Sequence, residues 1–294
     1  MGKHQDIRDR THLSGEDIKA LNFIKGSGKY TFRKYYRSGL RSHIFEVLLS
    51  ADLEKEISGE LVDGIRVYPR AAPVKMFRIF RQRFMDPDSI FREIKKYNLL
   101  LTWLGREFIA ASQEFIVDYR GTGSSQILLC GLQEYVEGDI LDPWRLFETG
   151  CLSDMFKARG YDPGRTKQCM AVLTDRTACF VKRIRDMINR TGFIPDLAGN
   201  GNLIVTPDGY LKLVDINNIV RITPDDIIRI DDKGYPSCDV SIQVLAILEQ
   251  VILGHTIRVD DPFYGVFLTS ERRRTVKDFE RAFYKKLKSV PQGG

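Results

Sequence analysis

The sequence predicts an α+β fold, because segments with strand-like and helix-like patterns both occur along it. Two short apolar runs, 203–205 and 211–214, flank the turn signal Pro207-Asp208-Gly209 and predict a β-hairpin. Two longer stretches, 173–188 and 240–252, repeat their apolar residues at helical spacing. The 294 residues suffice for one large core or for two lobes.

The first half of the chain carries two strand signals and one helix signal. Residues 74–77 read as a strand that contains Lys75, and residues 89–104 read as a helix that contains Glu93. Residues 127–138 (ILLCGLQEYVEG) read as an apolar strand that breaks at Glu137-Gly138.

Two helices are expected in the second half. The amphipathic stretch 173–188 is followed by Gly192, a residue typical of helix C-termini. The second helix begins near Asp239, a good N-cap residue, and its apolar run ends at Gly254.

Acidic and amide side chains surround the predicted hairpin. Its two strands would bring Asn202 and Asp215, thirteen residues apart, to the same end of a ribbon, and Asp196 lies just upstream. Both Asn202 and Asp215 offer oxygen ligands of the kind that Mg²⁺ takes when it is shared with phosphates. A solvated turn on an ordinary hairpin is the alternative reading of the same residues.

This arrangement resembles the catalytic and metal-binding loops of the protein-kinase-like superfamily, which includes protein kinases and aminoglycoside and choline phosphotransferases. The chain is similar to a divergent, bacterial-type member. The resemblance implies that Asp196 is the catalytic Asp and that Asn202 and Asp215 bind Mg²⁺. It also implies that Asp239 holds the backbone of the catalytic loop.

The sequence departs from the family pattern in this segment. Asp196 precedes Asn202 by six residues where the family motif has five, so either the loop carries one extra residue or Asn200 shares the amide role. Ile194 and Pro195 stand where His and Arg or Gly are usual, and Asp215 is followed by Ile-Asn rather than Phe-Gly.

The resemblance also names the parts of a nucleotide site upstream. Lys75 would contact the phosphates of ATP, and Glu93 would hold that lysine in place. Residues Glu134, Tyr135 and Val136 would form a hinge whose backbone receives the adenine edge.

The phosphate-covering loop is expected at Gly26 and Gly28, with Gly59 or Gly64 as competing locations. Gly28 precedes Lys75 by 47 residues, which requires an insertion near 41–63. That insertion contains the helix-like stretch 43–57 (HIFEVLLSADLEKEI). A plain glycine turn explains the same residues.

The resemblance implies a two-lobed fold with a sheet-rich N-terminal lobe, 1–136, and a helical C-terminal lobe, 137–294. The implied function is transfer of the γ-phosphoryl group of ATP to a hydroxyl acceptor with Mg²⁺ as cofactor. The segment from Asp215 to Asp239 is short, and Pro195 replaces the arginine that would pair with a phosphorylated activation loop. A small molecule, sugar or lipid headgroup is therefore slightly favoured over a protein acceptor.

The alternative is a pseudokinase, a binding or scaffolding module on the same fold. It is supported by the shifted Asp196, the missing His-Arg, Asn217 in place of Gly and the incomplete glycine loop.

The charge, the cysteines and the apolar runs of the chain indicate which partners and which compartment to expect. The net charge of +6 includes basic clusters that would suit an acidic partner or an anionic surface, namely Arg78, Arg81 and Arg83, Arg272 to Arg274, and Lys285, Lys286 and Lys288. The five cysteines lack a C-x-x-C pair, the start lacks a secretory pattern, and no apolar run is long enough for a membrane span. We therefore expect free thiols and a cytoplasmic protein.

Overall fold

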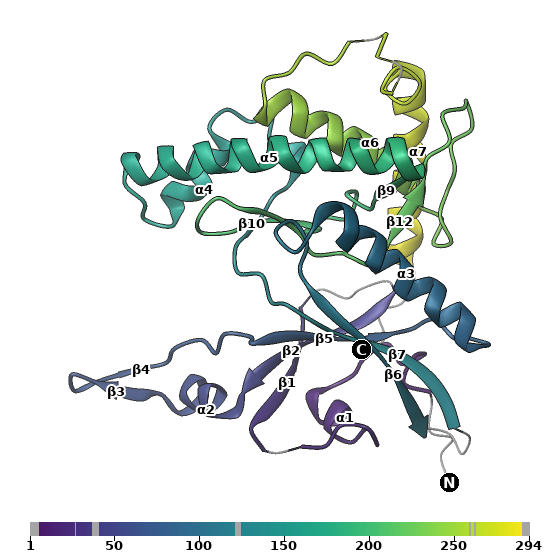
Figure 1. Ribbon diagram of the computed structural model, residues 1–294. Coiled ribbons are helices and arrows are strands. Elements are labelled where there is room, and N and C mark those ends of the chain that lie inside the picture. Colours follow the sequence, from purple (N-terminus) through teal and green to yellow (C-terminus); the bar gives the residue numbers. More distant parts are fainter. Residues whose placement is uncertain are drawn as a thin grey trace. The chain divides into compact units, whose positions relative to one another are not determined.

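The computed structural model describes residues 6–26, 28–36, 41–120, 125–258, 260–261 and 263–289, which fall into two units. Unit 1 contains the described residues up to Ile94 together with Ala111–Tyr135, and unit 2 contains Lys95–Ala110 and the described chain from Val136 onward. The fold is α+β: unit 1 is built on a five-stranded antiparallel sheet, and most helical residues belong to unit 2 (Figure 1).

The sheet of unit 1 has the strand order β1-β2-β5-β7-β6, and every neighbouring pair is antiparallel. Its register places Phe45 opposite Phe77 and Phe77 opposite Leu132. The strands of this sheet are β1 (Tyr30–Lys34), β2 (Ser42–Leu49), β5 (Lys75–Phe80), β6 (Ser112–Arg120) and β7 (Ser125–Gln133).

Both faces of this sheet are covered. On one face Phe77 and Ile79 pack with Ile18 of the short helix α1 (Gly15–Lys19) and with residues of the preceding segment. On the other face Phe80 packs against Ile90 of α3 (Pro87–Leu104). The strand expected at 74–77 and the helix expected at 89–104 are therefore present, and they pack together.

The helix expected over 43–57 is wrong in its first half. Residues 42–49 form β2, a strand of the main sheet, and only the part from Ser50 onward is helical, in α2 (Ser50–Ser58). Because β2 is buried on both faces, its apolar residues form a nearly continuous run. Such a run cannot be distinguished from a buried helix by periodicity.

A separate two-stranded hairpin, β3 (Glu60–Val62) and β4 (Ile65–Val67), follows α2. Its turn residues have positive φ, 51° at Asp63 and 80° at Gly64, as a two-residue hairpin turn requires. Gly59, with φ of 72°, lies just before β3. Gly59 and Gly64 thus build this hairpin, which accounts for both of the competing glycine positions.

Unit 2 is dominated by the long helix α5 (Pro163–Thr191), which begins after the capping carboxylate of Asp162 and ends at Gly192 with φ of 72°. The expected helix end at Gly192 is confirmed, whereas the helix begins earlier than its apolar pattern. The other helical elements of unit 2 are η1 (Pro143–Arg145), α4 (Cys151–Ala158), α6 (Ser237–Ile247), the π-helical turn η2 (Leu248–Ile252) and α7 (Ser270–Ser289).

Helix α6 lies in the centre of unit 2, since every one of its eleven residues is buried. A helix without a polar face must be surrounded by protein. The expected helix after Asp239 is therefore present, although its last turn before Gly254 is a π-turn.

The hairpin predicted around Pro207-Asp208-Gly209 is confirmed. Strands β10 (Leu203–Val205) and β11 (Leu211–Leu213) pair antiparallel, with Leu203 opposite Leu213. Strand β8 (Asp139–Ile140) adds to β10 and completes a three-stranded sheet. A second small pair joins β9 (Phe193–Pro195) to β12 (Ile219–Arg221).

The five cysteines are free thiols. Within the described ranges, none of the helices combines the length and the apolar character needed to traverse a bilayer.

Candidate functional site

The candidate site lies on the loop between β9 and β10 in unit 2. Strand β9 pairs with β12 so that Pro195 faces Ile219, and the next backbone hydrogen bond runs from the amide of Asp196 to the carbonyl of Asn218 over 3.0 Å. The chain therefore delivers Asp196 from the end of a paired strand, which fixes its backbone.

The Asp196 carboxylate is held on both oxygens and is only 9% exposed. Oδ1 accepts from the backbone N–H of Ala198 over 2.9 Å, and Oδ2 accepts from Nδ2 of Asn218 over 2.6 Å. Burial, with the nearby negative charge of Asp215, raises the pKa of Asp196 to about 6 despite these hydrogen bonds. A carboxyl group with a pKa in this range can take up and release a proton near neutral pH.

Asn202 closes the loop on itself. Its Nδ2 donates to the backbone carbonyl of Asp196 over 3.0 Å, and its own carbonyl accepts from the amide of Val214 over 2.8 Å. Asn202 is buried, whereas Asn200 is exposed. Of these two asparagines, Asn202 is therefore the one whose buried side chain bonds the backbone of Asp196.

Asp215 follows β11 and is half-buried. Its charge is the second contribution that raises the pKa of Asp196, so the two carboxylates lie close enough to repel each other. The predicted convergence of Asp196, Asn202 and Asp215 on one loop cluster is therefore present.

The loop is anchored to the buried helix α6 by Ser241. Its Oγ accepts the backbone N–H of Leu197 over 3.1 Å. The expectation that Asp239 makes this contact is wrong: the Asp239 carboxylate is buried in an ion pair with the guanidinium of Arg272. That pairing satisfies a charge which α6 could not otherwise bury.

Asn202 and Asp215 can offer a metal ion two protein ligands. Asn202 uses its side-chain N–H on Asp196, which leaves its amide oxygen as the ligand atom, and Asp215 supplies a carboxylate. Within the described ranges there is no group of three or more His, Cys, Asp or Glu side chains that can hold a metal ion. Mg²⁺ commonly binds through one or two protein oxygens plus phosphates and waters, so these residues fit it only together with a nucleotide.

Lys75 and Glu93 are not brought together. Lys75 is exposed at the start of β5, and strand alternation places it on the face of Phe77. Helix α3, which carries Glu93, covers the opposite face, that of Phe80.

The cation that β5 does place on the α3 side is Arg78. Its guanidinium forms a buried ion pair of 2.7 Å with Glu114 of β6 and also donates to Ser112 over 3.1 Å. Gly131 of β7 lies between these strands, and a Cβ atom there would come within 2.9 Å of the Glu114 carboxylate. This buried pair was not predicted, and its signal was the unusual placement of Arg78 among apolar strand residues.

In the described chain, the residues expected to receive the adenine edge of a nucleotide take part in the fold of their own units. The backbone N–H of Glu134 donates to the carbonyl of Ala111 over 2.7 Å, so this amide is engaged within unit 1. Tyr135 ends unit 1 and Val136 is the first residue of the following segment of unit 2, where it is buried.

Gly26 and Gly28 are exposed and precede β1, in a segment whose central residue, Ser27, lies outside the described residues. A Cβ atom at either glycine would meet nothing within 4 Å, and Gly28 has φ of 70°. Gly28 is therefore explained by a turn that needs positive φ.

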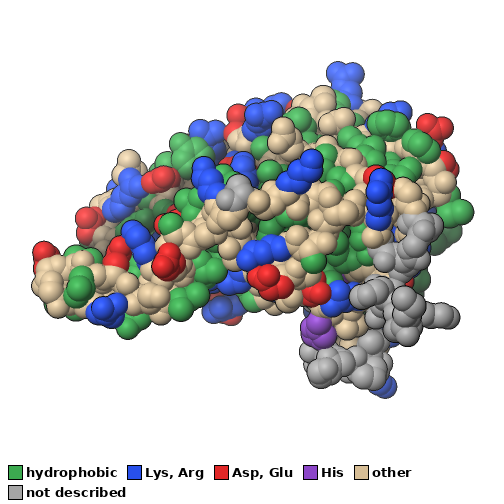
Figure 2. Space-filling model, turned by 90° about the horizontal axis from the view of Figure 1, so that it is seen from below, with side chains coloured by type: hydrophobic (Ala, Val, Ile, Leu, Met, Phe, Trp, Pro, Cys, Tyr) green, Lys and Arg blue, Asp and Glu red, His purple; other side chains and the backbone are tan. Residues whose placement is uncertain are grey.

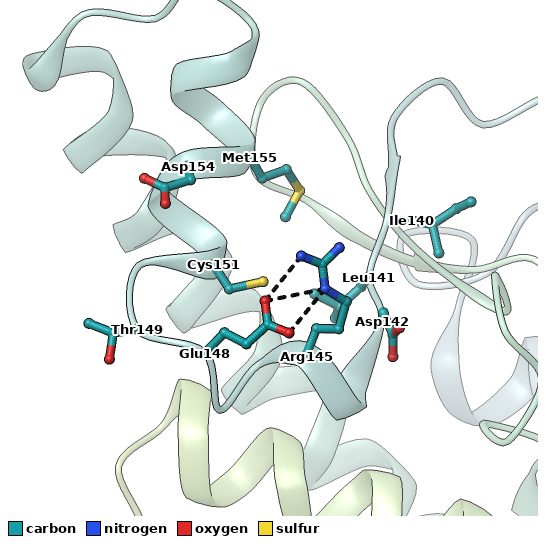
Figure 3. A pocket seen from close by; sticks show the side chains of 9 residues that line it. All are labelled: Ile140, Leu141, Asp142, Arg145, Glu148, Thr149, Cys151, Asp154 and Met155. Carbon is teal, nitrogen blue, oxygen red and sulfur yellow. Dashed lines mark hydrogen bonds and ion pairs between the residues drawn. The ribbon is translucent and has the colours of Figure 1, made fainter.

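A cavity of about 300 Å³ in unit 2 is lined by residues from β8 to α4 (Figure 3). Ile140 of β8 and Met155 of α4 give it apolar walls, and Arg145 and Glu148, paired over 3.0 Å, line it with charge. Leu141 at the cavity wall donates its backbone N–H to the carbonyl of Leu203, the residue after Asn202, over 2.9 Å.

Several side chains of the basic clusters are engaged in ion pairs within the protein. Arg78 and Arg272 are buried in ion pairs, and Arg83 pairs with Asp6 and Asp9 of unit 1. The side chain of Lys288 lies outside the described residues.

Comparison with models of protein families finds no match for this chain, and no curated protein matches it significantly.

Three residues of the site were not predicted: Asn218, Ser241 and Arg272. They contact Asp196, Leu197 and Asp239 from 22, 44 and 33 residues away in sequence. Asn218 had a weak signal as one of two consecutive asparagines after a strand, whereas Ser241 and Arg272 lie in ordinary helical patterns without a local signal.

Proposed function

We propose that the chain is a phosphotransferase that moves the γ-phosphoryl group of ATP to a hydroxyl group, on a two-lobed protein-kinase-like fold. Units 1 and 2 would be the sheet-rich and the helical lobe. The observation that carries the proposal is the state of Asp196: a buried carboxyl with a pKa of about 6, fixed by Ala198 and Asn218 next to a second carboxylate. Perturbed carboxyl groups of this kind gather at catalytic sites.

In the proposed reaction Asp196 orients the acceptor hydroxyl and takes its proton as the oxygen attacks the γ-phosphorus. The bond from the γ-phosphorus to the bridging oxygen breaks, ADP leaves with the electron pair, and the phosphorylated acceptor and the proton on Asp196 remain. Asn218 keeps the carboxylate in one orientation, and the anchor from Leu197 to Ser241 fixes the backbone beside it.

Asn202 and Asp215 would hold Mg²⁺ against the phosphates, where the cation neutralises charge on the transferred group. The residues themselves favour a cation here. The negative charge of Asp215 helps to raise the pKa of Asp196, and no positive side chain of the described chain is among the causes that lower it.

A small acceptor is favoured over a protein. The cavity lined by residues from β8 to α4, whose Leu141 bonds to the residue after Asn202, combines apolar walls with charged side chains, as sites for small polar molecules do. Between Asp215 and α6 the chain forms β12 and irregular structure only, which leaves little room for a peptide platform.

The second candidate is a pseudokinase, which two observations favour. Lys75 and Glu93 lie on different faces of the sheet, and the backbone N–H of Glu134 is already used. A chain of this kind would bind a nucleotide or a partner without transferring phosphate.

The test has two stages. The thermal unfolding midpoint of the wild type is measured with ATP alone and with ATP plus Mg²⁺, beside Asp215→Ala and the control Asp226→Ala, which alters an exposed carboxylate outside the site. A ligand at about 100 times its dissociation constant stabilises a protein by roughly 2.7 kcal/mol. We expect the wild type and Asp226→Ala to shift with ATP plus Mg²⁺ and Asp215→Ala not to shift.

The second stage follows transfer of labelled γ-phosphate to a panel of amino alcohols, sugars and lipid headgroups, with Asp196→Asn as the inactive control. A Mg²⁺-dependent shift without transfer to any acceptor supports the pseudokinase. No shift in the wild type contradicts the nucleotide site altogether.

A further inference from the structure

The hairpin β3–β4 and the helix α2 before it expose apolar side chains to an unusual degree. Three of them are more than half exposed, as is Tyr68 directly after β4: Ile57 (70%), Leu61 (68%), Ile65 (68%) and Tyr68 (61%). The hairpin projects from the sheet of unit 1 in Figure 1, and the same end of Figure 2 carries apolar side chains between charged ones. Strand alternation puts Leu61 on one face of the hairpin and Ile65 on the other, so the hairpin exposes apolar side chains on both faces. Exposed apolar side chains gathered on one element are a signal of an interaction surface.

The hairpin is a specified element. Its Asp63-Gly64 turn has the positive φ angles that match the twist of a hairpin, and the guanidinium of Arg66 donates to the carbonyl of Ser58 over 2.7 Å, which ties β4 to α2. However, β3 and β4 form a sheet of only two strands. An isolated two-stranded hairpin is marginally stable in water, so this one would gain stability from further pairing.

The edges of the main sheet differ from those of the hairpin. Edge strand β1 carries Arg33 and Lys34, and edge strand β6 carries several charged residues, as edges that avoid association do. On β3 the single charged residue, Glu60, pairs with Lys55 over 2.8 Å. The outer edge of β3 therefore carries a single charged side chain, at its first residue, and two apolar ones.

We propose that the β3 edge pairs with β3 of a second copy of this chain, antiparallel about a two-fold axis at Leu61, to give a four-stranded sheet. In this register Leu61 faces Leu61 of the second copy, and Glu60 faces Val62, so no like charges meet. Pairing through β4 instead would oppose Arg66 to itself. The surface is thus complementary to itself along β3 and along no other hairpin edge.

The backbone of Leu61 suits this pairing. The hairpin turn joins Val62 to Ile65, and Leu61 belongs to the next pair, opposite Arg66. Because hydrogen-bonded and non-hydrogen-bonded pairs alternate, the N–H and C=O of Leu61 point away from β4. Two copies can then exchange both bonds at Leu61.

The experiment uses the full chain and sedimentation velocity over a wide range of protein concentration. The wild type should form a dimer. Leu61→Asp and Leu61→Arg should each raise the dimer dissociation constant about a hundredfold, since two buried leucines are lost and like charges meet at the axis. An equimolar mixture of the two variants should associate again, because Asp and Arg then face each other.

The matched control is Met85→Asp with Met85→Arg, at an exposed apolar residue outside the hairpin. These variants should dimerise like the wild type, alone and mixed. Leu61 belongs to no buried core, so circular dichroism and the unfolding midpoint should be unchanged in its variants. A wild type that stays monomeric overturns the proposal and leaves the hairpin to a different protein; a dimer indifferent to both Leu61 variants, or a mixture that does not associate, overturns it as well.

Discussion

The side-chain amide of Asn218 donates a 2.6 Å hydrogen bond to Oδ2 of Asp196, and the backbones of the same two residues are joined by a second hydrogen bond. This double link fixes a carboxylate in a buried place where its charge is unfavourable. Because this charge is unfavourable, replacing Asp196 should change the free energy of unfolding.

Asp196→Asn should stabilise the protein at neutral pH while it abolishes phosphate transfer. The pKa of Asp196 rises from 3.8 to about 6 on folding, so the free energy of unfolding falls as the pH rises from about 4 to about 6 and stays reduced above that range. The variant removes this loss, which amounts to at most about 3 kcal/mol. Asn218 can turn its amide to donate or accept, so the new side chain keeps a partner.

Urea unfolding followed by tryptophan fluorescence measures this effect, because both tryptophans, Trp103 and Trp144, belong to unit 2. At pH 7.5 the variant should be more stable than the wild type, and below pH 4 the difference should vanish. Asp226→Asn, at an exposed position, should show neither effect. A variant less stable than the wild type at pH 7.5 contradicts the burial of an unfavourable charge.

His43 should destabilise unit 1 in acid. It is 2% exposed, and burial lowers its pKa from 6.5 to about 4, with Nε2 against the carbonyl of Ile7 at 3.0 Å. Its contribution is complete above pH 6.5 and is lost as the pH falls toward 4, by at most about 3 kcal/mol. Over this range the hydrogen-exchange protection factors of the β2 and β5 amides, which correct for the slower intrinsic exchange in acid, should fall in the wild type and fall less in His43→Gln, which keeps a donor and cannot titrate. An equal fall of the protection factors in both proteins would exclude His43 as the cause.

Arg272→Leu should destabilise unit 2 by about 3–5 kcal/mol, because it leaves the Asp239 carboxylate buried without its partner. The guanidinium also donates to the carbonyl of Ile227 over 3.2 Å. The double variant Asp239→Leu with Arg272→Leu should recover much of the loss, since no unpaired charge remains. Arg273→Ala, at the exposed neighbouring position, should change the unfolding midpoint little. Additive losses in the double variant would argue against the pair.

Ser241→Ala should destabilise unit 2 by about 1–3 kcal/mol, because the buried N–H of Leu197 loses its acceptor. Ser153→Ala, which removes an exposed hydroxyl that bonds the Gly150 carbonyl, should cost less than about 0.5 kcal/mol. Denaturant midpoints give both values, and equal midpoints would show that the loop does not depend on α6.

Thr177→Val should act in the opposite direction. Thr177 of α5 is fully buried, and its Oγ1 has no hydrogen-bond partner in the described structure. Valine has nearly the same shape and no polar atom, so we expect stabilisation of about 1 kcal/mol. Thr174→Val removes a hydroxyl that does bond, to the Met170 carbonyl over 3.0 Å, and should not stabilise. Thermal midpoints of the two variants separate these cases.

Local signals explain which elements were predictable. The β10–β11 hairpin follows from apolar runs around a Pro-Asp-Gly turn, and the end of α5 follows from Gly192, whose positive φ ends a helix. The β3–β4 hairpin has an equally strong turn signal in Asp63-Gly64. The helix-like pattern of the residues before it led to the prediction of an insertion with a helix instead. Strand β2 was mistaken because a strand buried on both faces loses its alternation.

The site was predictable only in part, since burial decides between similar residues. Asn200 and Asn202 both precede or follow a glycine, and only the structure shows that Asn202 is buried against Asp196. The spacing of Lys75 and Glu93 suggested a pair, but spacing does not show on which face of a sheet a side chain lies. The contacts of Ser241 and Arg272 depend on how α6 and α7 pack, which no local pattern records.

The two outer edges of the β3–β4 hairpin are chemically unequal, because β3 presents Leu61 and β4 presents Arg66. A sheet that adds one receptive edge after another grows without limit, as filaments do. The guanidinium on the outer strand ends such growth at two chains. Replacing Arg66 with valine would remove this stop, and light scattering that rises steadily with time would report open-ended assembly.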